Sequence, residues 1–145
     1  MARKTPALLA PARPAANICD YVRTQLDSLE VRGLCRVDSL VLSCLAYLKM
    51  PPAAKRAYGS RELTIEDLAR PEWAEDLCGA TFDAHSLWEL LLACAASPRF
   101  ANIAVSDYVQ VSDERLEYQF SAVAFELPGC GHYVAFRGTD NTLVG

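Results

Sequence analysis

Residues 116–136, Leu-Glu-Tyr-Gln-Phe-Ser-Ala-Val-Ala-Phe-Glu-Leu-Pro-Gly-Cys-Gly-His-Tyr-Val-Ala-Phe, decide the fold of this chain. Residues 116–127 are rich in aromatic and β-branched side chains, and the turn residues at 128–131 separate them from a second apolar run at 133–136. Upstream, apolar and polar residues alternate over 103–111. The sequence therefore predicts three consecutive strands that form an antiparallel meander.

The last of these strands is the most apolar. Four consecutive apolar residues at 133–136 indicate a strand that is covered on both faces. Such a strand needs neighbours and a covering layer, and three strands with a few helices supply these poorly. Residues 137–145 carry no further helix or strand pattern. We therefore expect a central strand at 133–136 and a domain that is incomplete at its C-terminus.

Four helices are expected before the meander. The first follows an N-cap at Asn17 and ends near Gly33, and the second follows Asp38 and stops at Pro51. The third begins at the Thr64–Asp67 capping box. The fourth begins at the Ser86–Glu89 capping box and ends at Pro98. Because the second helix is apolar on nearly all sides, we expect it to be buried. The role of residues 53–82 stays open.

Composition excludes several classes of protein. The chain has 145 residues, of which 52% are hydrophobic, and 18 acidic against 14 basic residues leave a formal net charge of −4. No basic stripe for nucleic acid is expected, and no apolar run reaches the roughly 18–20 residues of a membrane span. Residues 1–16 are basic and interrupted by prolines, unlike a signal peptide. We expect a disordered basic Ala/Pro-rich leader at 1–16 and one domain over 17–145 of a cytoplasmic protein.

The six cysteines do not follow a metal-binding pattern. No two of them lie within four residues of each other, so the spacing of a zinc or iron–sulfur site is missing, and we expect neither a metal nor a cofactor. Cys44 and Cys94 fall inside apolar helical patterns, where cysteine acts as a small buried hydrophobe. Six reduced thiols are the favoured interpretation, and the even count leaves disulfides as the alternative.

No complete catalytic motif can be read from the residues. The 145 residues contain no Gly-x-Ser-x-Gly and no phosphate-binding glycine loop. His132 lies two residues after Cys130, so a thiol–imidazole pair is conceivable, although a tight turn is the plainer interpretation. His85 and Glu89 are four residues apart, which gives too few ligands for a metal site.

Residues 133–145, Tyr-Val-Ala-Phe-Arg-Gly-Thr-Asp-Asn-Thr-Leu-Val-Gly, resemble the signature of the Mbeg-like family, bacterial α/β-hydrolases related to class 3 lipases. Further similar segments are 17–21, 37–43, 99–100, 106–109, 119–123 and 125–128. The resemblance covers most of residues 17–145 and is weak over 53–82. It implies the N-terminal part of an α/β hydrolase-like fold, in which helices precede an antiparallel three-strand meander (α+β as it stands).

The resemblance also implies a role for one residue. In class 3 lipases the residue after Phe-Arg-Gly bears a hydroxyl and lines the oxyanion hole, a position that falls on Thr139. Gly138 would let the chain turn where a side chain would clash, and the N–H and hydroxyl of Thr139 would face the developing negative oxygen. From the residues alone, the simpler interpretation is that Thr139 and Asp140 open a turn. Arg137 receives no catalytic role.

These observations lead to two hypotheses. The resemblance implies an N-terminal fragment of a lipase- or esterase-like serine hydrolase that acts on an ester or acyl substrate, with its serine, acid and histidine beyond residue 145. No hydrolase activity is then expected of the 145 residues alone. The alternative is a non-catalytic interaction module, or a truncated gene product, built from the helices and the meander. The sequence predicts neither the substrate nor the oligomeric state.

Overall fold

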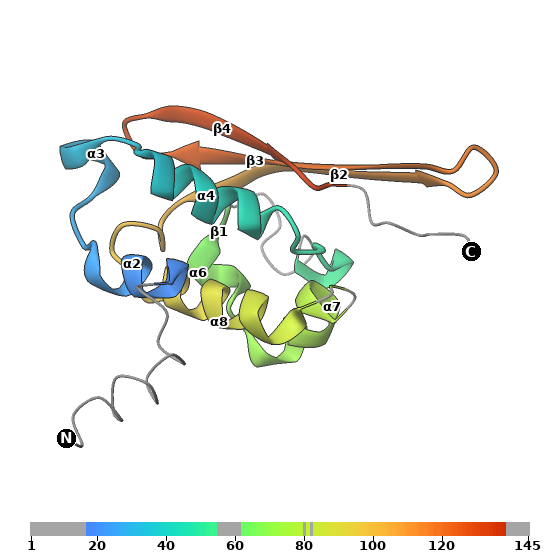
Figure 1. The fold of residues 1–145 in the computed structure, drawn as a ribbon, viewed down its shortest axis with the longest axis horizontal. Coiled ribbons are helices and arrows are strands. Elements are labelled where there is room, and N and C mark those ends of the chain that lie inside the picture. Colours follow the sequence, from blue (N-terminus) through green and yellow to red (C-terminus); the bar gives the residue numbers. More distant parts are fainter. Residues whose placement is uncertain (1–16, 55–61, 80, 82, 139–145) are drawn as a thin grey trace, which may run out of the picture.

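The computed structural model describes residues 17–54, 62–79, 81 and 83–138 (Figure 1). Short helices come first and the long strands last. In chain order the elements are α2 (Ile18–Thr24), α3 (Leu29–Arg32), α4 (Arg36–Leu45), β1 (Leu63–Thr64), α6 (Ile65–Leu68), η2 (Pro71–Trp73), α7 (Ala74–Cys78), α8 (Ala84–Ala95), β2 (Ala104–Asp113), β3 (Tyr118–Leu127) and β4 (Gly131–Phe136). The leader expected at 1–16 lies outside the described residues.

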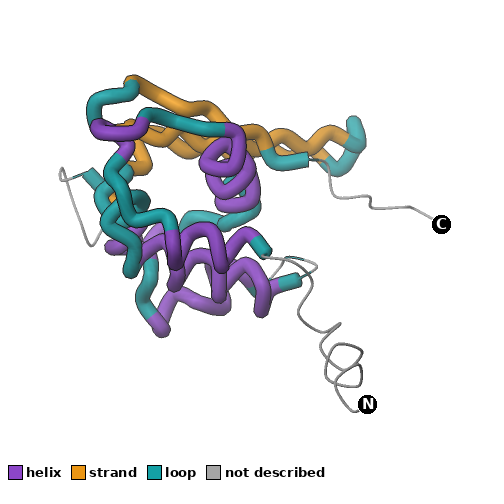
Figure 2. The backbone as a smooth tube through the Cα atoms, turned by 60° about the vertical axis from the view of Figure 1, so that its left-hand side comes forward, coloured by secondary structure: helices purple, strands orange, loops and turns teal. Residues whose placement is uncertain are grey.

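The strands form one antiparallel sheet in the order β1-β2-β3-β4. β2, β3 and β4 make the meander, and the two-residue β1, which the sequence does not predict, pairs with the start of β2. The helices lie on one face of this sheet, with α4 next to the strands and α8 further away (Figures 1 and 2). Fully buried side chains such as Leu42, Leu91 and Phe125 fill the space between the two layers.

β4 is an edge strand in the part of the chain that the structure describes, so the expectation of a central strand at 133–136 is wrong there. Ala135 faces the helices and is buried, whereas Val134 and Phe136 are 53% and 63% exposed on the outer face of the sheet. The Phe136 ring packs beside that of Phe120, with centroids 5.8 Å apart. Residues 133–136 are thus consecutively apolar because both the face of β4 toward the helices and its outer face carry apolar side chains.

A β-bulge in β2 reverses the alternation predicted for 103–111. The pairing shifts between Val105 and Asp107, so Val105 lies opposite Phe125 on the core side and Val109 lies opposite Ala122 on the outer side. An extra residue in one strand moves every later side chain to the other face. Val109 and Val111 are therefore 41% and 47% exposed, although the predicted alternation places them on the same face as Ile103 and Val105.

Local hydrogen bonds begin two of the four expected helices as predicted. The N-cap at Asn17 and the capping box at Thr64 are confirmed, since each side chain accepts from the backbone N–H of the third helical residue, whose own side chain accepts from the backbone of the cap residue. The predicted start at Ser86 is wrong. Asp83 caps α8 instead, because its carboxylate accepts the Ser86 backbone N–H at 3.2 Å and the helix gains two residues before Ser86.

α4 is buried on one face only. Val41, Leu42 and Leu45 are fully buried beneath the sheet, but Leu40 is 55% exposed. The expectation of a helix buried on nearly all sides is therefore wrong for the described residues. Asp38, on the buried face of the first turn, is fully buried, and its partners are described below.

Candidate functional site

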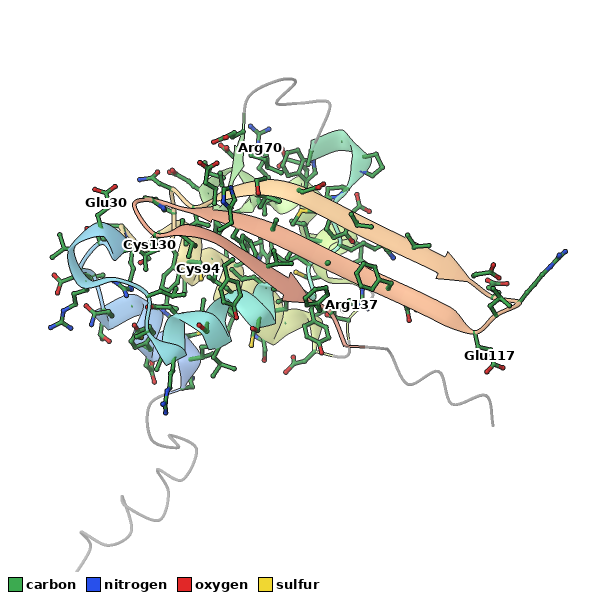
Figure 3. The ribbon with its side chains drawn as sticks, turned by 90° about the horizontal axis from the view of Figure 1, so that it is seen from above. Glu30, Arg70, Cys94, Glu117, Cys130 and Arg137 are labelled. Atoms are coloured by element: carbon green, nitrogen blue, oxygen red, sulfur yellow. The ribbon has the colours of Figure 1, made fainter. Side chains whose placement is uncertain are left out.

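The end of β4 packs on the end of α4. The Arg137 backbone N–H donates to the Ser121 carbonyl at 2.9 Å and extends the β3–β4 ladder by one residue. The Arg137 guanidinium lies over the Tyr47 ring, 5.8 Å from its centroid, and Figure 3 shows Arg137 where the strand ends. A Cβ on Gly138 would lie 3.0 Å from the Tyr47 hydroxyl oxygen. Position 138 therefore lies beside the hydroxyl end of the Tyr47 side chain.

Thr139, the residue to which the resemblance assigns the oxyanion role, lies outside the described residues. Arg137 and Gly138, which precede it directly, show where β4 delivers the chain. They lie at the end of α4, on the helical side of the sheet, beside a cavity. Asp140 also lies outside the described residues.

This cavity, which we name the β4-end cavity, has a volume of about 410 Å³. Its floor consists of buried or half-buried apolar side chains from α2, α4 and α8: Ile18, Cys19, Cys44, Leu87 and Leu90. The remaining lining residues are Asn17, Tyr47, Thr81, Asp83, Ser86, Glu89 and Arg137. Asp83, Ser86 and Glu89 are exposed, so the cavity has an apolar floor and a polar rim.

Several polar side chains of the rim have partners within the protein. Asn17 Oδ1 accepts from the Asp20 backbone N–H at 3.0 Å, Thr81 Oγ1 donates to the Cys78 carbonyl at 2.7 Å, Asp83 accepts from Ser86, Glu89 lies 3.3 Å from the His85 Nε2, and Arg137 lies over Tyr47. The hydrogen bonds from Ser86 lower the pKa of Asp83. The floor offers a ligand apolar side chains.

A second cluster joins three of the segments that carry the family resemblance. Asp38 Oδ1 accepts from the Tyr21 hydroxyl at 2.8 Å and from Arg99 Nε at 2.9 Å, and its Oδ2 accepts from the Cys35 backbone N–H at 2.8 Å and from Arg99 Nη2 at 2.6 Å. The Arg99 guanidinium also donates to the carbonyls of Asp27 and Gly33. We name Tyr21, Asp38 and Arg99 the buried polar cluster.

The charges in this cluster compensate each other. Burial by itself raises the pKa of Asp38, but hydrogen bonds from Arg99, the Cys35 N–H and Tyr21 outweigh it and lower that pKa to about 2. The same carboxylate raises the pKa of Arg99. Because both Asp38 oxygens have two donors each and Arg99 is also bonded to two carbonyls, this cluster holds α2, α4 and the loop before β2 together. It has the features of a structural site, with no group left to act on a substrate.

The other candidate groups do not assemble into a catalytic site. Cys130 donates its thiol proton to the Leu29 carbonyl at a distance of 3.4 Å, and His132 is exposed on β4, opposite Glu126. His85 and Glu89 form an exposed contact along α8. Among the described residues no group of three or more potential metal ligands occurs.

All six cysteines are free. Burial raises the pKa values of Cys19, Cys44, Cys78 and Cys94, that of Cys78 to about 11. Such thiols stay protonated at neutral pH and are poor nucleophiles. Cys94 is fully buried in α8, which agrees with its predicted role as a small hydrophobic residue.

Comparison with known proteins gives one match. Residues 94–145 match the Mbeg1-like family model. The Mbeg1-like match starts near the end of α8, runs through the meander and includes the Arg137–Gly138 step. It supports, over that stretch, the family named from the sequence. No curated protein and no solved structure matches the chain. No helix within the described ranges has the length and apolar character needed to cross a bilayer.

Sequence reasoning missed the partners of these groups. Tyr47 was expected only as an apolar helix residue, yet it contacts both Arg137 and Gly138. Asp38 was expected only to precede a helix, yet it is the acceptor at the centre of the buried polar cluster. An acidic residue in the first turn of a strongly apolar helix is the signal that could have indicated a buried ion pair.

Proposed function

We propose that this chain supplies the oxyanion side of a serine acyl hydrolase of the lipase or esterase type. The observation that supports this most directly is the family match over 94–145, which contains the strand, the Arg137–Gly138 step and Thr139 in one continuous stretch. The relationship to lipases itself comes from the sequence resemblance.

In the proposed reaction a serine attacks the ester carbonyl and the carbonyl oxygen becomes negatively charged. The backbone N–H and hydroxyl of Thr139 donate hydrogen bonds to that oxygen and stabilise the tetrahedral intermediate. The 145 residues contain no nucleophile elbow, so the proposal assigns the serine and its base to residues outside them. These residues alone are then expected to have no hydrolase activity.

The test uses the gene as it stands in the genome. If the reading frame continues past residue 145 into a Gly-x-Ser-x-Gly segment, the longer product is assayed on p-nitrophenyl esters. Thr139→Ala should lower kcat by about 10²–10³, the usual effect of losing an oxyanion donor, while Thr139→Ser, which keeps the hydroxyl, should retain most activity. Full activity of Thr139→Ala would contradict the oxyanion role. Ester hydrolysis by the 145 residues alone that is abolished by Thr139→Ala would contradict the assignment of the serine and its base to residues outside these 145.

A second function is favoured by the outer face of the sheet. Val109, Val111, Val134 and Phe136 are large apolar side chains that are each more than 40% exposed there. Exposed apolar patches of this kind mark contact surfaces. A non-catalytic interaction module would be supported by a reading frame that stops at residue 145 together with a monodisperse chain that unfolds cooperatively. An aggregating chain would count against it.

A further inference from the structure

The β4-end cavity borders the end of β4, where Arg137 precedes Thr139 by two residues. Arg137 and Tyr47 line it, and Gly138 packs on the hydroxyl of that tyrosine. Three helices that are distant in sequence, α2, α4 and α8, contribute its floor. The cavity therefore borders the chain just before the residue to which the proposed function assigns the oxyanion role.

The chemistry of the lining favours a hydrocarbon. The floor presents Ile18, Leu87, Leu90 and the thiols of Cys19 and Cys44. The thiols stay protonated because burial raises their pKa values, so the floor carries no charge. On the rim, Asn17, Thr81 and Asp83 are already hydrogen-bonded within the protein. A ligand would gain little from polar groups and most from removing its own apolar surface from water.

We propose that the β4-end cavity binds the unbranched alkyl chain of an acyl substrate, with the carbonyl end of that substrate at the Arg137–Gly138 rim. The assignment as an acyl site rests on the proposed function, whereas the binding of an alkyl chain does not. A volume of about 410 Å³ is near the lower end of the roughly 300–1,000 Å³ typical of ligand pockets, so the chain is of short to medium length.

Binding of simple alkyl compounds to the full 145-residue chain tests this directly. Butyrate, hexanoate, octanoate and the corresponding primary alcohols are titrated by calorimetry below their micelle concentrations. Because each buried methylene contributes about 0.8 kcal/mol, the dissociation constant should fall about fourfold per methylene in both series until the cavity is full. A series in which only the carboxylates bind would show an anion site at the rim and would overturn the proposal.

Variants place the ligand in the cavity. Cys44→Phe and Ile18→Trp fill the floor from α4 and α2 respectively, and each should weaken octanoate binding at least tenfold. Cys130→Phe is the matched control, since Cys130 is exposed in the turn between β3 and β4 and should bind octanoate as the unaltered chain does. Unchanged affinity in both floor variants would overturn the proposal.

A readout on the unaltered chain keeps the test decisive if the floor variants fail to fold. Octanoate should slow the labelling of Cys44 by N-ethylmaleimide at least severalfold and leave the labelling of exposed Cys130 unchanged. Equal rates with and without octanoate would overturn the proposal. If the longer product hydrolyses esters but the chain binds no alkyl compound, only the cavity assignment is refuted. If the chain binds alkyl compounds but the Thr139→Ala variant of the longer product is fully active, only the oxyanion role is refuted.

Discussion

Asp38→Asn tests whether the buried polar cluster holds the helical layer together. Asp38 accepts four hydrogen bonds, two on each carboxylate oxygen, and all four donors lie within 2.9 Å of their acceptors. An asparagine of the same volume has one oxygen and one NH₂ group, so in either orientation two donors meet another donor. The substitution also leaves the Arg99 charge, whose side chain is only 2% exposed, without a counter-ion.

Removing one partner of a buried ion pair costs about 3–5 kcal/mol, and we expect the free energy of unfolding to fall by that amount. Urea unfolding followed by circular dichroism measures it as a lower midpoint with an unchanged slope. Asp76→Asn, at an exposed position of α7, is the matched control and should change stability by less than about 0.5 kcal/mol. A cost below about 1 kcal/mol for Asp38→Asn would refute the reasoning, because the ion pair would then add little to the contacts around it.

Three further predictions follow from the same contacts. The pKa of Asp38 is about 2 in the folded chain, against an ordinary value of 3.8. About 2 kcal/mol of folding stability is therefore present above pH 3.8 and is lost as the pH falls through 2. Unfolding measured over a series of acidic pH values should show this loss in the unaltered chain and not in Asp38→Asn. A Cβ at position 138 would meet only the hydroxyl end of the Tyr47 side chain, which is 39% exposed and can shift, so Gly138→Ala should change the free energy of unfolding by less than about 1 kcal/mol; a loss of more than about 2 kcal/mol in urea unfolding would contradict this. A thiol reagent should modify Cys130 in the folded chain and Cys94 only on unfolding, and simultaneous reaction of both would contradict the burial of Cys94.

Much of the fold could be predicted from local patterns. The meander follows from strand periods at 116–136 and from the turn at 128–131, because neighbouring residues alone set alternation and turn geometry. The caps at Asn17 and Thr64 could be predicted for the same reason, since a cap and its partner are three residues apart. Of the candidate site, the sequence located the Arg137–Gly138 step and Thr139 through resemblance, and it could not predict Tyr47 as the neighbour of that step.

The limits appear wherever distant segments meet. By itself the sequence determined that helices precede a three-strand meander, that these residues contain no nucleophile elbow, and that residues 133–145 carry the family resemblance. Only the tertiary structure decided that a bulge turns Val109 outward, that β4 is the edge strand of the described sheet, and that Asp38 finds Arg99 61 residues away. These outcomes depend on pairing register and on the burial of charge, which involve residues far apart in the chain, so no local window of the sequence contains them.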